Sequence, residues 1–318
     1  MSPLNARRFQ FRWTGDAAPL EENWFHGRGQ HSSSRDLVNG ARFYQLEDSV
    51  RIAVETALEL GEPLLVTGEP GTGKTQLAYY LAYKLGCGEP LRFQVKSNSL
   101  ATDLLYQFDA VKYFHAGRPS PTDALARAPL DPRQFLTRGV LWRAIESARP
   151  QVVLIDEIDK APRDFPNDLL QALDEYKWDV LETGESVQLP PEQWDRRPVV
   201  IITSNLERKL PEPFLRRCLY CHLPFSKELL ERSIRARSHE LGTPSPAFVQ
   251  LAIERFMEVR NLAIRKRPST AEALVWFRAL RLFGVDEEVL RRARPGEIPH
   301  LEALVKDKDD QDALTRNS

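Results

Sequence analysis

The 318-residue sequence has no apolar run near the roughly 18 residues that a membrane-spanning helix requires. Its first residues, in which Arg7, Arg8 and Arg12 stand among aromatic side chains, also lack the apolar segment of a secretory signal peptide. These two absences favour a cytoplasmic protein with no membrane partner. The composition, 42% hydrophobic and 28% charged, is that of an ordinary soluble globular chain.

Cysteine is scarce, with only Cys87, Cys218 and Cys221 in the chain. Three cysteines cannot form a disulfide framework, and Cys218 and Cys221 have no second Cys or His pair at zinc-finger spacing. We therefore expect buried cysteines in strands. Net charge is also nearly absent, at −1, so the chain lacks the basic excess of a dedicated nucleic-acid binder, although a local basic groove stays open as an alternative.

The most specific pattern present is a phosphate-binding loop, G-x-x-x-x-G-K-[ST]. An apolar run at 63–67 precedes the loop and predicts a buried parallel strand, and leucines at helical spacing follow it until Gly86. This is the strand, loop and helix that the motif requires. The residues expected to bind ATP are Gly68, Glu69, Pro70, Gly71, Thr72, Gly73, Lys74, Thr75 and Gln76.

The chemistry of the loop assigns roles to its last residues. Glycines let backbone N–H groups point inward at phosphate oxygens, at the positive end of a helix. Lys74 adds a mobile positive charge for the phosphates, and the Thr75 hydroxyl is expected to bind Mg²⁺. A glycine-rich turn that only caps a helix is the alternative, but it does not explain Lys-Thr at the helix start after an apolar strand.

Further apolar segments predict the fold class. Strands are expected at 91–95, 151–155, 199–203 and 218–223, and a helix is expected from Glu47 to Leu60, ended by Gly61. Strands that are apolar on both faces and alternate with helices indicate an α/β domain, a parallel sheet sandwiched by helices. From Ser226 onward only amphipathic helical patterns occur, at 227–241, 246–261, 269–283 and 286–293.

The change in composition divides the chain into three predicted parts. Residues 1–42 have no sustained period and are loop-like near 31–34, so we expect a tail or an arm that embraces a neighbouring subunit. Residues 43–224 are expected to form the nucleotide-binding domain, and 225–318 a small all-helical domain. The proline-rich stretch 116–132 is expected to be a solvated loop, with a client-facing arm as the alternative.

Two carboxylates directly follow the predicted strand at 151–155. Open α/β sheets bind ligands at the carboxyl ends of their strands. Asp156 is positioned there to hold Mg²⁺ through its water shell, and Glu157 to orient or deprotonate the water that attacks the γ-phosphate. The alternative is a solvated turn after a buried strand.

Polar residues after two other predicted elements extend the candidate catalytic site. Asn205 follows the strand at 199–203, and its amide is expected to hydrogen-bond the γ-phosphate or the attacking water. Arg216 and Arg217 end a helix-sized segment before the last strand. Arginine fingers stabilise charge on the transferred phosphoryl group and can come from a neighbouring molecule. A surface ion pair is the alternative for these arginines.

In this order the four elements resemble the Walker A, Walker B, sensor 1 and arginine-finger elements of AAA+ ATPases. A finer similarity, to the MoxR-like branch, lies in Tyr44-Gln45 and in the stretches 63–75, 139–144, 154–160 and 169–175. The resemblance covers about 43–310 and implies a P-loop NTPase core followed by a helical lid domain. It also implies a homo-oligomer, a hexameric ring with ATP at the subunit interfaces.

The same resemblance assigns further residues. It favours Arg217 over its neighbour Arg216 as the finger that acts on the adjacent subunit, and it places Tyr44 beside the adenine. A helix-2 insert at about 100–137 would face the pore or a partner. The family's lid helix begins with an arginine that senses the γ-phosphate, but Ser269 stands at that place, which leaves Arg267, Lys266 or no residue in this role.

Together, residues and resemblance predict an ATP-hydrolysing ring motor or chaperone that remodels or activates a protein client, which carries a von Willebrand A domain in related families. One alternative is a nucleic-acid-dependent motor or restriction-type NTPase, and the near-neutral charge argues against nucleic acid as the partner. The other is a nucleotide-gated assembly switch, and the presence of Glu157 argues against such a slow enzyme.

Overall fold

The computed structural model describes residues 33–117, 130–237, 243–262 and 265–316. They form two units. The sheet unit comprises residues 48–68 and 74–223, and the helical unit comprises the described parts of 1–47, 69–73 and 224–318. The expectations for the N-terminal 32 residues and for most of the proline-rich stretch lie outside the described residues. No described helix combines the length and the apolarity needed to cross a bilayer.

A five-stranded parallel sheet organises the sheet unit, in the order β2-β5-β8-β1-β9. Its strands are β1 (Leu64–Gly68), β2 (Leu91–Gln94), β5 (Val152–Asp156), β8 (Val199–Ser204) and β9 (Leu219–Leu223). Because β8 lies between β1 and β5, the carboxyl ends of these three strands meet at one edge of the sheet. That edge carries the phosphate loop, the two carboxylates and the predicted asparagine.

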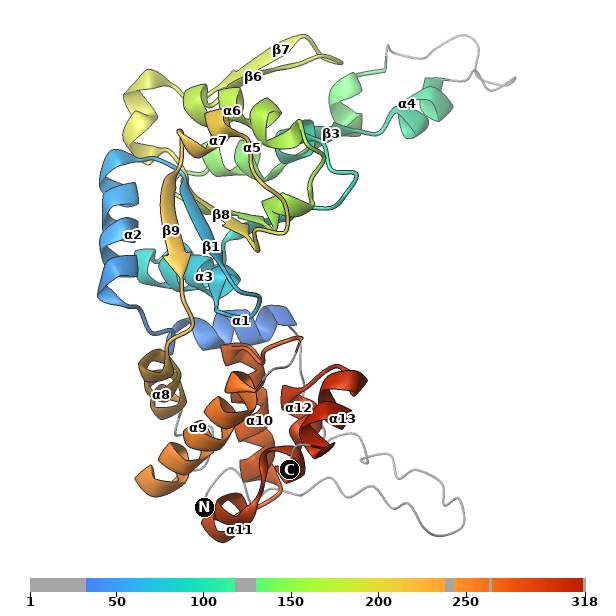
Figure 1. The fold of residues 1–318 in the computed structure, drawn as a ribbon. Coiled ribbons are helices and arrows are strands. Elements are labelled where there is room, and N and C mark those ends of the chain that lie inside the picture. The colour runs from blue at the N-terminus through green and yellow to red at the C-terminus, as the bar shows by residue number, and fades with distance from the viewer. Residues whose placement is uncertain (1–32, 118–129, 238–242, 263–264, 317–318) are drawn as a thin grey trace, which may run out of the picture. The chain divides into compact units, whose positions relative to one another are not determined.

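Helices bury the central strands from both sides, and β1 and β5 are buried at every position. Helix α2 (Asp48–Leu60) packs on β1 and β9, as Figure 1 shows, and α3 (Lys74–Leu85) packs on β1, β5 and β8. Helix α5 (Val140–Ile145) packs on β2 and β5. The predicted α/β fold, a parallel sheet flanked by helices, is therefore confirmed.

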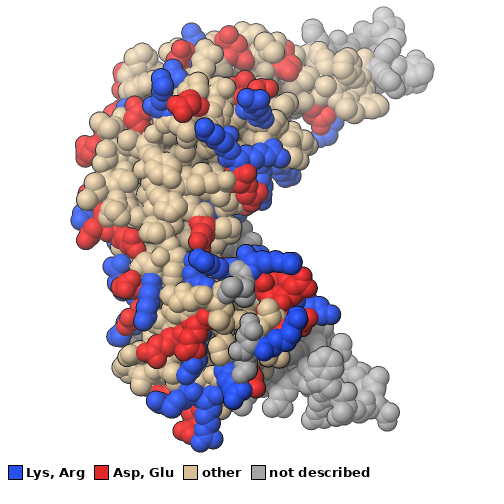
Figure 2. Space-filling view, in the orientation of Figure 1, with Lys and Arg blue, Asp and Glu red and all other residues tan. Residues whose placement is uncertain are grey.

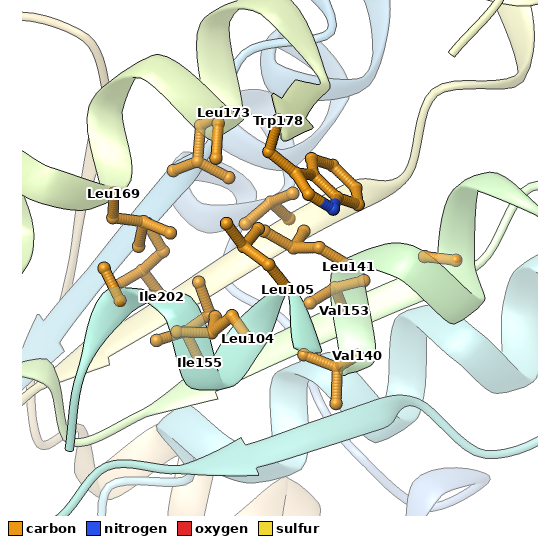
Figure 3. Packing of buried hydrophobic residues seen from close by; sticks show 14 of the residues in the cluster. Leu104, Leu105, Val140, Leu141, Val153, Ile155, Leu169, Leu173, Trp178 and Ile202 are labelled. Atoms are coloured by element: carbon orange, nitrogen blue, oxygen red, sulfur yellow. The ribbon is translucent and has the colours of Figure 1, made fainter. Parts of the chain in front are cut away.

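One face of the sheet packs against α5 and α6 (Phe165–Glu175). Figure 3 shows Val153, Ile155 and Ile202 of the sheet grouped with Leu169 and Leu173 of α6. Burial of each such side chain contributes about 1.5–3 kcal/mol. This packing fixes β5 and β8, whose last residues carry the candidate site.

Most shorter elements of the sheet unit were not predicted from the sequence. Strand β3 (Tyr106–Phe108) pairs antiparallel with β4 (Leu136–Arg138), and β6 (Lys177–Val180) with β7 (Glu185–Gln188). Helix α4 (Ala110–Gly117) follows β3, and α7 (Glu212–Leu215) forms the expected helical segment before the paired arginines. The hairpin strands have only three or four residues each, too few for an alternating pattern to be distinguished.

The helical unit has its own core around Phe256, Trp276 and Phe277, each almost fully buried. The Trp276 indole N–H donates to the backbone oxygen of Pro299 at 2.8 Å, which satisfies its polar group inside the core. No strand occurs among the described residues after β9, as predicted. The helices are α8 (Lys227–Ala236), α9 (Pro246–Asn261), α10 (Thr270–Leu282), α11 (Glu287–Arg292), α12 (Leu301–Leu304) and α13 (Lys308–Arg316).

Helix ends illustrate what local sequence can and cannot show. Gly61 and Gly86 follow α2 and α3 with φ near +67°, so both predicted stops are confirmed. In contrast, α1 (Ser33–Ala41) is a helix that begins inside the segment expected to be loop-like. That expectation was wrong for Ser33 and Ser34, because nine residues with few apolar positions give too weak a period to detect.

The cysteines follow the prediction only in part. Cys221 is buried on β9, whereas Cys218 precedes the strand and Cys87 follows α3, both half-buried. Burial raises the pKa of the Cys218 thiol to about 12 and that of Cys221 to about 11. Because the thiolate is the nucleophile, neither residue is suited to nucleophilic catalysis near neutral pH.

Candidate nucleotide-binding and catalytic site

The phosphate loop turns sharply between β1 and α3. Gly68, Gly71 and Gly73 have φ angles of 148°, 76° and 97°, which side chains disfavour. Lys74 is the first residue of α3, and its Nζ donates to the backbone oxygen of Gly68 at 2.9 Å. The Thr72 hydroxyl donates to the backbone oxygen of Glu69 at 2.9 Å. The loop is thus closed by its own side chains at the start of a helix.

Within the helical unit, the loop residues 69–73 are closely packed. A Cβ on Gly73 would lie 3.0 Å from Cε2 of Tyr44, and a Cβ on Gly71 would lie 2.2 Å from Oγ of Ser269. A side chain at Gly71 would therefore clash with Ser269, and one at Gly73 would crowd the ring of Tyr44, in addition to the strain of the φ angles. The predicted adenine-pocket residue Tyr44 and the lid residue Ser269 both lie against the loop.

Exposure differs among the predicted ATP-binding residues. Lys74 is buried, with 6% of its surface exposed, and burial lowers the pKa of its ammonium group. The carboxylates of Asp159, Asp156 and Glu157 oppose that shift. Of the other loop residues, Gly68 and Thr72 are buried, Gly73, Thr75 and Gln76 are half-buried, and Glu69, Pro70 and Gly71 are exposed.

Asp156, the last residue of β5, is held by hydroxyl groups from two other elements. Its Oδ1 accepts hydrogen bonds from Thr75 Oγ1 at 3.0 Å and from Thr203 Oγ1 at 2.6 Å. The side chain is almost fully buried. The structure therefore brings the two predicted metal-binding residues, Thr75 and Asp156, into direct contact, although they are 81 positions apart in the sequence.

Glu157 leaves the strand in a left-handed backbone conformation, with φ 62° and ψ 53°. This conformation costs a non-glycine residue about 1–2 kcal/mol, so the contacts around Glu157 must hold its backbone in place. The Glu157 backbone N–H donates to Thr203 Oγ1 at 2.8 Å. Its Oε2 accepts from Gln94 Nε2 and from Lys160 Nζ, both at 2.6 Å, and the carboxylate raises the pKa of Lys160.

Strand β2 contributes two site residues that the sequence reasoning missed. Arg92 donates to Asp156 Oδ2 at 2.6 Å and also to Gln94 Oε1, while Gln94 contacts Glu157. Both side chains reach the site because residues i and i+2 share a face of a strand and β2 pairs with β5. The polar residues within the predicted strand 91–95 were the available signal.

Asn205 follows β8 as predicted, and its placement depends on a buried acid. Asp159 Oδ2 accepts hydrogen bonds from the backbone N–H groups of Asn205, at 3.2 Å, and Glu207, at 3.0 Å. Asp159 is 3% exposed, and its other oxygen has no hydrogen-bond partner among the described residues. The sequence reasoning treated Asp159 only as part of a motif and missed this role.

The paired arginines after α7 differ in their surroundings. Arg217 Nε lies 2.6 Å from Oδ2 of Asp174, at the end of α6, and the two side chains are about half exposed. Arg216 Nη2 lies 3.8 Å from Glu212, and 81% of the Arg216 side chain is exposed. Among the described ion pairs, Arg217 and Arg216 therefore contact acids of their own surface, Asp174 and Glu212, and not the carboxylates of the site.

Ser269, which stands at the predicted place of a lid arginine, has a structural role at the start of α10. Ser269 is the N-cap of α10, and Glu272 completes the reciprocal capping pair. Arg267 and Lys266 are exposed. Instead, Arg260 near the end of α9 donates to Glu69 Oε2 at 2.5 Å, within the helical unit. The sequence reasoning did not consider Arg260 as a contact of the phosphate loop.

The donors at the strand ends fit Mg²⁺ and a nucleoside triphosphate. Carboxylate and hydroxyl oxygens, such as those of Asp156 and Thr75, are the ligands and second-shell partners that Mg²⁺ prefers, usually with several waters retained. The buried, unpartnered Oδ1 of Asp159 is a further acceptor for such water. The glycine loop at a helix N-terminus, with a buried lysine, has the features that bind phosphate groups.

Comparison with protein families finds a similar domain in this region. Residues 63–218 match the family described as the AAA domain of the dynein-related subfamily. These residues are therefore similar to an AAA domain. The match spans four of the five sheet strands, all but β9, and with them the phosphate loop, both carboxylates and the paired arginines. Among curated proteins, no sequence matches the chain.

Solved structures with a similar fold include NtrX from Brucella abortus in complex with ATP, at 14% identity and a TM-score of 0.49. A putative ATPase from Cytophaga hutchinsonii has 17% identity and a TM-score of 0.40, with 90% of this chain and 94% of that chain covered. RuvB from Thermotoga maritima has 15% identity and a TM-score of 0.41, with 86% and 70% covered. The match to NtrX covers 90% of this chain and 64% of the NtrX chain.

Proposed function

We propose that this AAA domain hydrolyses ATP in a Mg²⁺-dependent reaction at the phosphate loop and the strand ends. The observation that carries the proposal is the contact of Thr75 with Asp156 at 3.0 Å, with Glu157 directly after Asp156. Thr75 and Asp156 would hold Mg²⁺, which when bound neutralises charge on the phosphate oxygens. Lys74 binds the phosphates, and Glu157 orients the attacking water and accepts its proton.

We further propose that hydrolysis is completed by an arginine from a neighbouring copy of the chain in a hexameric ring. The exposure of Arg216 and Arg217 supports this, because a finger must leave its own subunit to reach another nucleotide. Arg217 remains the preferred finger. Its ion pair with Asp174 is partly exposed to solvent, so it contributes little stability and can be broken when Arg217 reaches a neighbouring subunit. Asn205 binds the γ-phosphate or the attacking water.

A protein client is the proposed target of the motor, as in the MoxR-like branch. Helix α4, within the predicted insert, exposes Val111 and Phe114 to 66% and 71%. Tyr113 of the same helix packs on Phe108 and Phe135, with ring centroids 5.4 Å from each, so the helix is anchored on its inner side. An anchored helix with exposed apolar residues is typical of a surface that binds protein. A von Willebrand A domain is one proposed type of client.

Surface charge also supports a protein rather than a nucleic acid as the client. On the face drawn in Figure 2, Lys and Arg side chains are interspersed with Asp and Glu. Binding along a nucleic-acid backbone depends on neutralising consecutive phosphates, which a continuous basic stripe supplies. The mixed pattern on this face lacks such a stripe.

The proposed hydrolysis is tested with Glu157→Gln in single-turnover kinetics. This variant is expected to bind ATP with wild-type affinity and to hydrolyse it slower by orders of magnitude, because the amide cannot accept the proton of water. Glu59→Gln, an exposed change on α2, is the matched control and should behave as wild type. Wild-type turnover by Glu157→Gln would contradict the proposed role of the carboxylate.

The proposed client is tested with the ATP-loaded Glu157→Gln protein as bait. A bound protein should be lost when Val111 and Phe114 are both changed to Ser, whereas a change at the exposed Val275 of α10 should have no effect. Stimulation of wild-type turnover by DNA or RNA, with no such protein, would instead favour the nucleic-acid motor.

A further inference from the structure

A guanidinium group occupies the acidic end of β5 in the sheet unit. Arg92 Nη2 lies 2.6 Å from Asp156 Oδ2, and Asp156 is 3% exposed while Arg92 is 32% exposed at its side chain. Charge-assisted bonds of this length are among the stronger hydrogen bonds of proteins. The carboxylate expected to serve Mg²⁺ is therefore already neutralised by a cation of the chain itself.

The position of Arg92 is fixed from several sides. Its guanidinium donates to Gln94 Oε1 on the same strand. It also acts on the hydroxyl of Tyr79 in α3, where it opposes the rise that burial causes in the pKa of Tyr79. Gln94 in turn donates to Glu157, so one chain of contacts joins Arg92 to both carboxylates. Without such partners, a long arginine side chain on the surface would sample many rotamers and would not stay in this position.

The occupancy of Asp156 limits how a metal ion can use it. Its Oδ1 already accepts from Thr75 and Thr203, and Arg92 binds the other oxygen, Oδ2. A divalent cation or its water shell that approaches this carboxylate is repelled by the fixed positive charge of Arg92 and competes with it for the oxygen lone pairs. An arginine cannot relieve this by losing its proton.

We propose that Arg92 is a resident counter-cation of Asp156 that Mg²⁺ must displace, so that the metal binds well only together with the nucleotide phosphates. The inference rests on the proposed Mg²⁺ site at Thr75 and Asp156. In the metal-free state Arg92 pairs with the buried carboxylate. Without this partner, the buried negative charge of Asp156 would cost free energy of folding. Phosphate oxygens supply the additional attraction that lets the metal replace the guanidinium.

The test measures binding of a fluorescent ADP analogue to wild type and to Arg92→Gln, with EDTA and with increasing Mg²⁺. In Arg92→Gln, the affinity for the ADP analogue in EDTA should fall, because a positive charge near the phosphates is lost. The Mg²⁺ concentration that gives half of the maximal increase in affinity for the analogue should fall on the order of tenfold. A change of this size is within the usual range of coupling between two sites. Arg51→Gln, which removes a charge from an exposed pair on α2, is the matched control.

A second readout does not involve nucleotide. Free Mn²⁺ is measured by its electron paramagnetic resonance signal during titration of the nucleotide-free protein. Arg92→Gln should bind Mn²⁺ more tightly than wild type. Arg92→Lys keeps the positive charge, so its affinity for Mn²⁺ should stay close to that of wild type. It also provides a second variant if Arg92→Gln folds poorly. An arginine that only holds the fold together would not increase affinity for metal when removed.

Each result decides between specific explanations. Equal Mg²⁺ dependence in wild type and Arg92→Gln overturns the inference and leaves Arg92 a structural ion pair. A higher Mg²⁺ requirement in Arg92→Gln also overturns it, and shows that Arg92 supports the metal from a second shell. If Mg²⁺ has no effect on nucleotide binding even in wild type, the proposed metal site itself fails, and the inference fails with it.

Discussion

The Thr203 hydroxyl lies 2.6 Å from Oδ1 of Asp156, and this contact links the neighbouring strands β8 and β5 at the edge of the sheet that carries the candidate site. The same hydroxyl accepts the backbone N–H of Glu157 at 2.8 Å. One buried side chain therefore positions the metal-site carboxylate and the residue that carries the proposed base. Its removal should affect both at once.

Thr203→Val should reduce the free energy of unfolding by about 1–3 kcal/mol, because the buried Asp156 carboxylate and the partly buried N–H of Glu157 each lose a partner. ATP turnover should fall as well, while Thr203→Ser, which keeps the hydroxyl, should retain most of both properties. Urea unfolding without nucleotide and steady-state hydrolysis are the measurements. A valine variant as stable and active as the serine variant would show that the two hydrogen bonds have no role.

Lys74→Ala should weaken ATP binding and abolish hydrolysis, because the buried ammonium is the mobile positive charge of the phosphate loop. Equilibrium titration with a fluorescent ATP analogue and a phosphate-release assay measure the two effects. Lys84→Ala, an exposed change on the same helix, should leave both unaltered. Wild-type affinity together with wild-type turnover in Lys74→Ala would remove the loop from the active site.

Asp159→Ala should disturb the position of Asn205, because it removes the acceptor of two backbone N–H groups, at Asn205 and Glu207. Hydrogen bonds to a charged group contribute roughly 1.5–3 kcal/mol each, so stability should also fall. We expect a larger loss in kcat than in nucleotide affinity. Asp164→Ala changes a nearby exposed acid and serves as control. Unchanged kcat in Asp159→Ala would separate Asp159 from catalysis.

The arginine finger can be identified by mixing variants. Arg217→Ala should fold and bind nucleotide but lose turnover by roughly 10³–10⁵-fold, the effect of fingers in other NTPases. Mixed with Lys74→Ala subunits, Arg217→Ala should regain activity at interfaces where its intact phosphate loop receives Arg217 from the neighbour. Arg216→Ala, tested in parallel, decides between the two arginines.

Native mass spectrometry shows whether mixed rings form in that experiment. Mixed rings without restored activity for either arginine would contradict action across an interface. Restored activity for Arg216→Ala alone would transfer the role to Arg216, whose side chain is the more exposed of the two.

Local features of the sequence predicted the five sheet strands to within about one residue at each end, because they are apolar on both faces and bounded by turn signals. They failed for the hairpins β3–β4 and β6–β7 and for α1, which depend on packing more than on a sustained period. Helices α12 and α13 were also missed. Each has few apolar residues, and these are recognised as core positions only once they pack in the helical unit.

The sequence by itself determined the phosphate loop and the acids Asp156 and Glu157, because that chemistry requires specific residue types at fixed spacing beside an apolar strand. Only the tertiary structure decided which other side chains surround them. The strand order places β8 between β1 and β5 and places β2 beside β5, which brings Thr203, Arg92 and Gln94 to the carboxylates. Their spacing in the chain carries no information about this meeting, since parallel strands pair through long crossover connections.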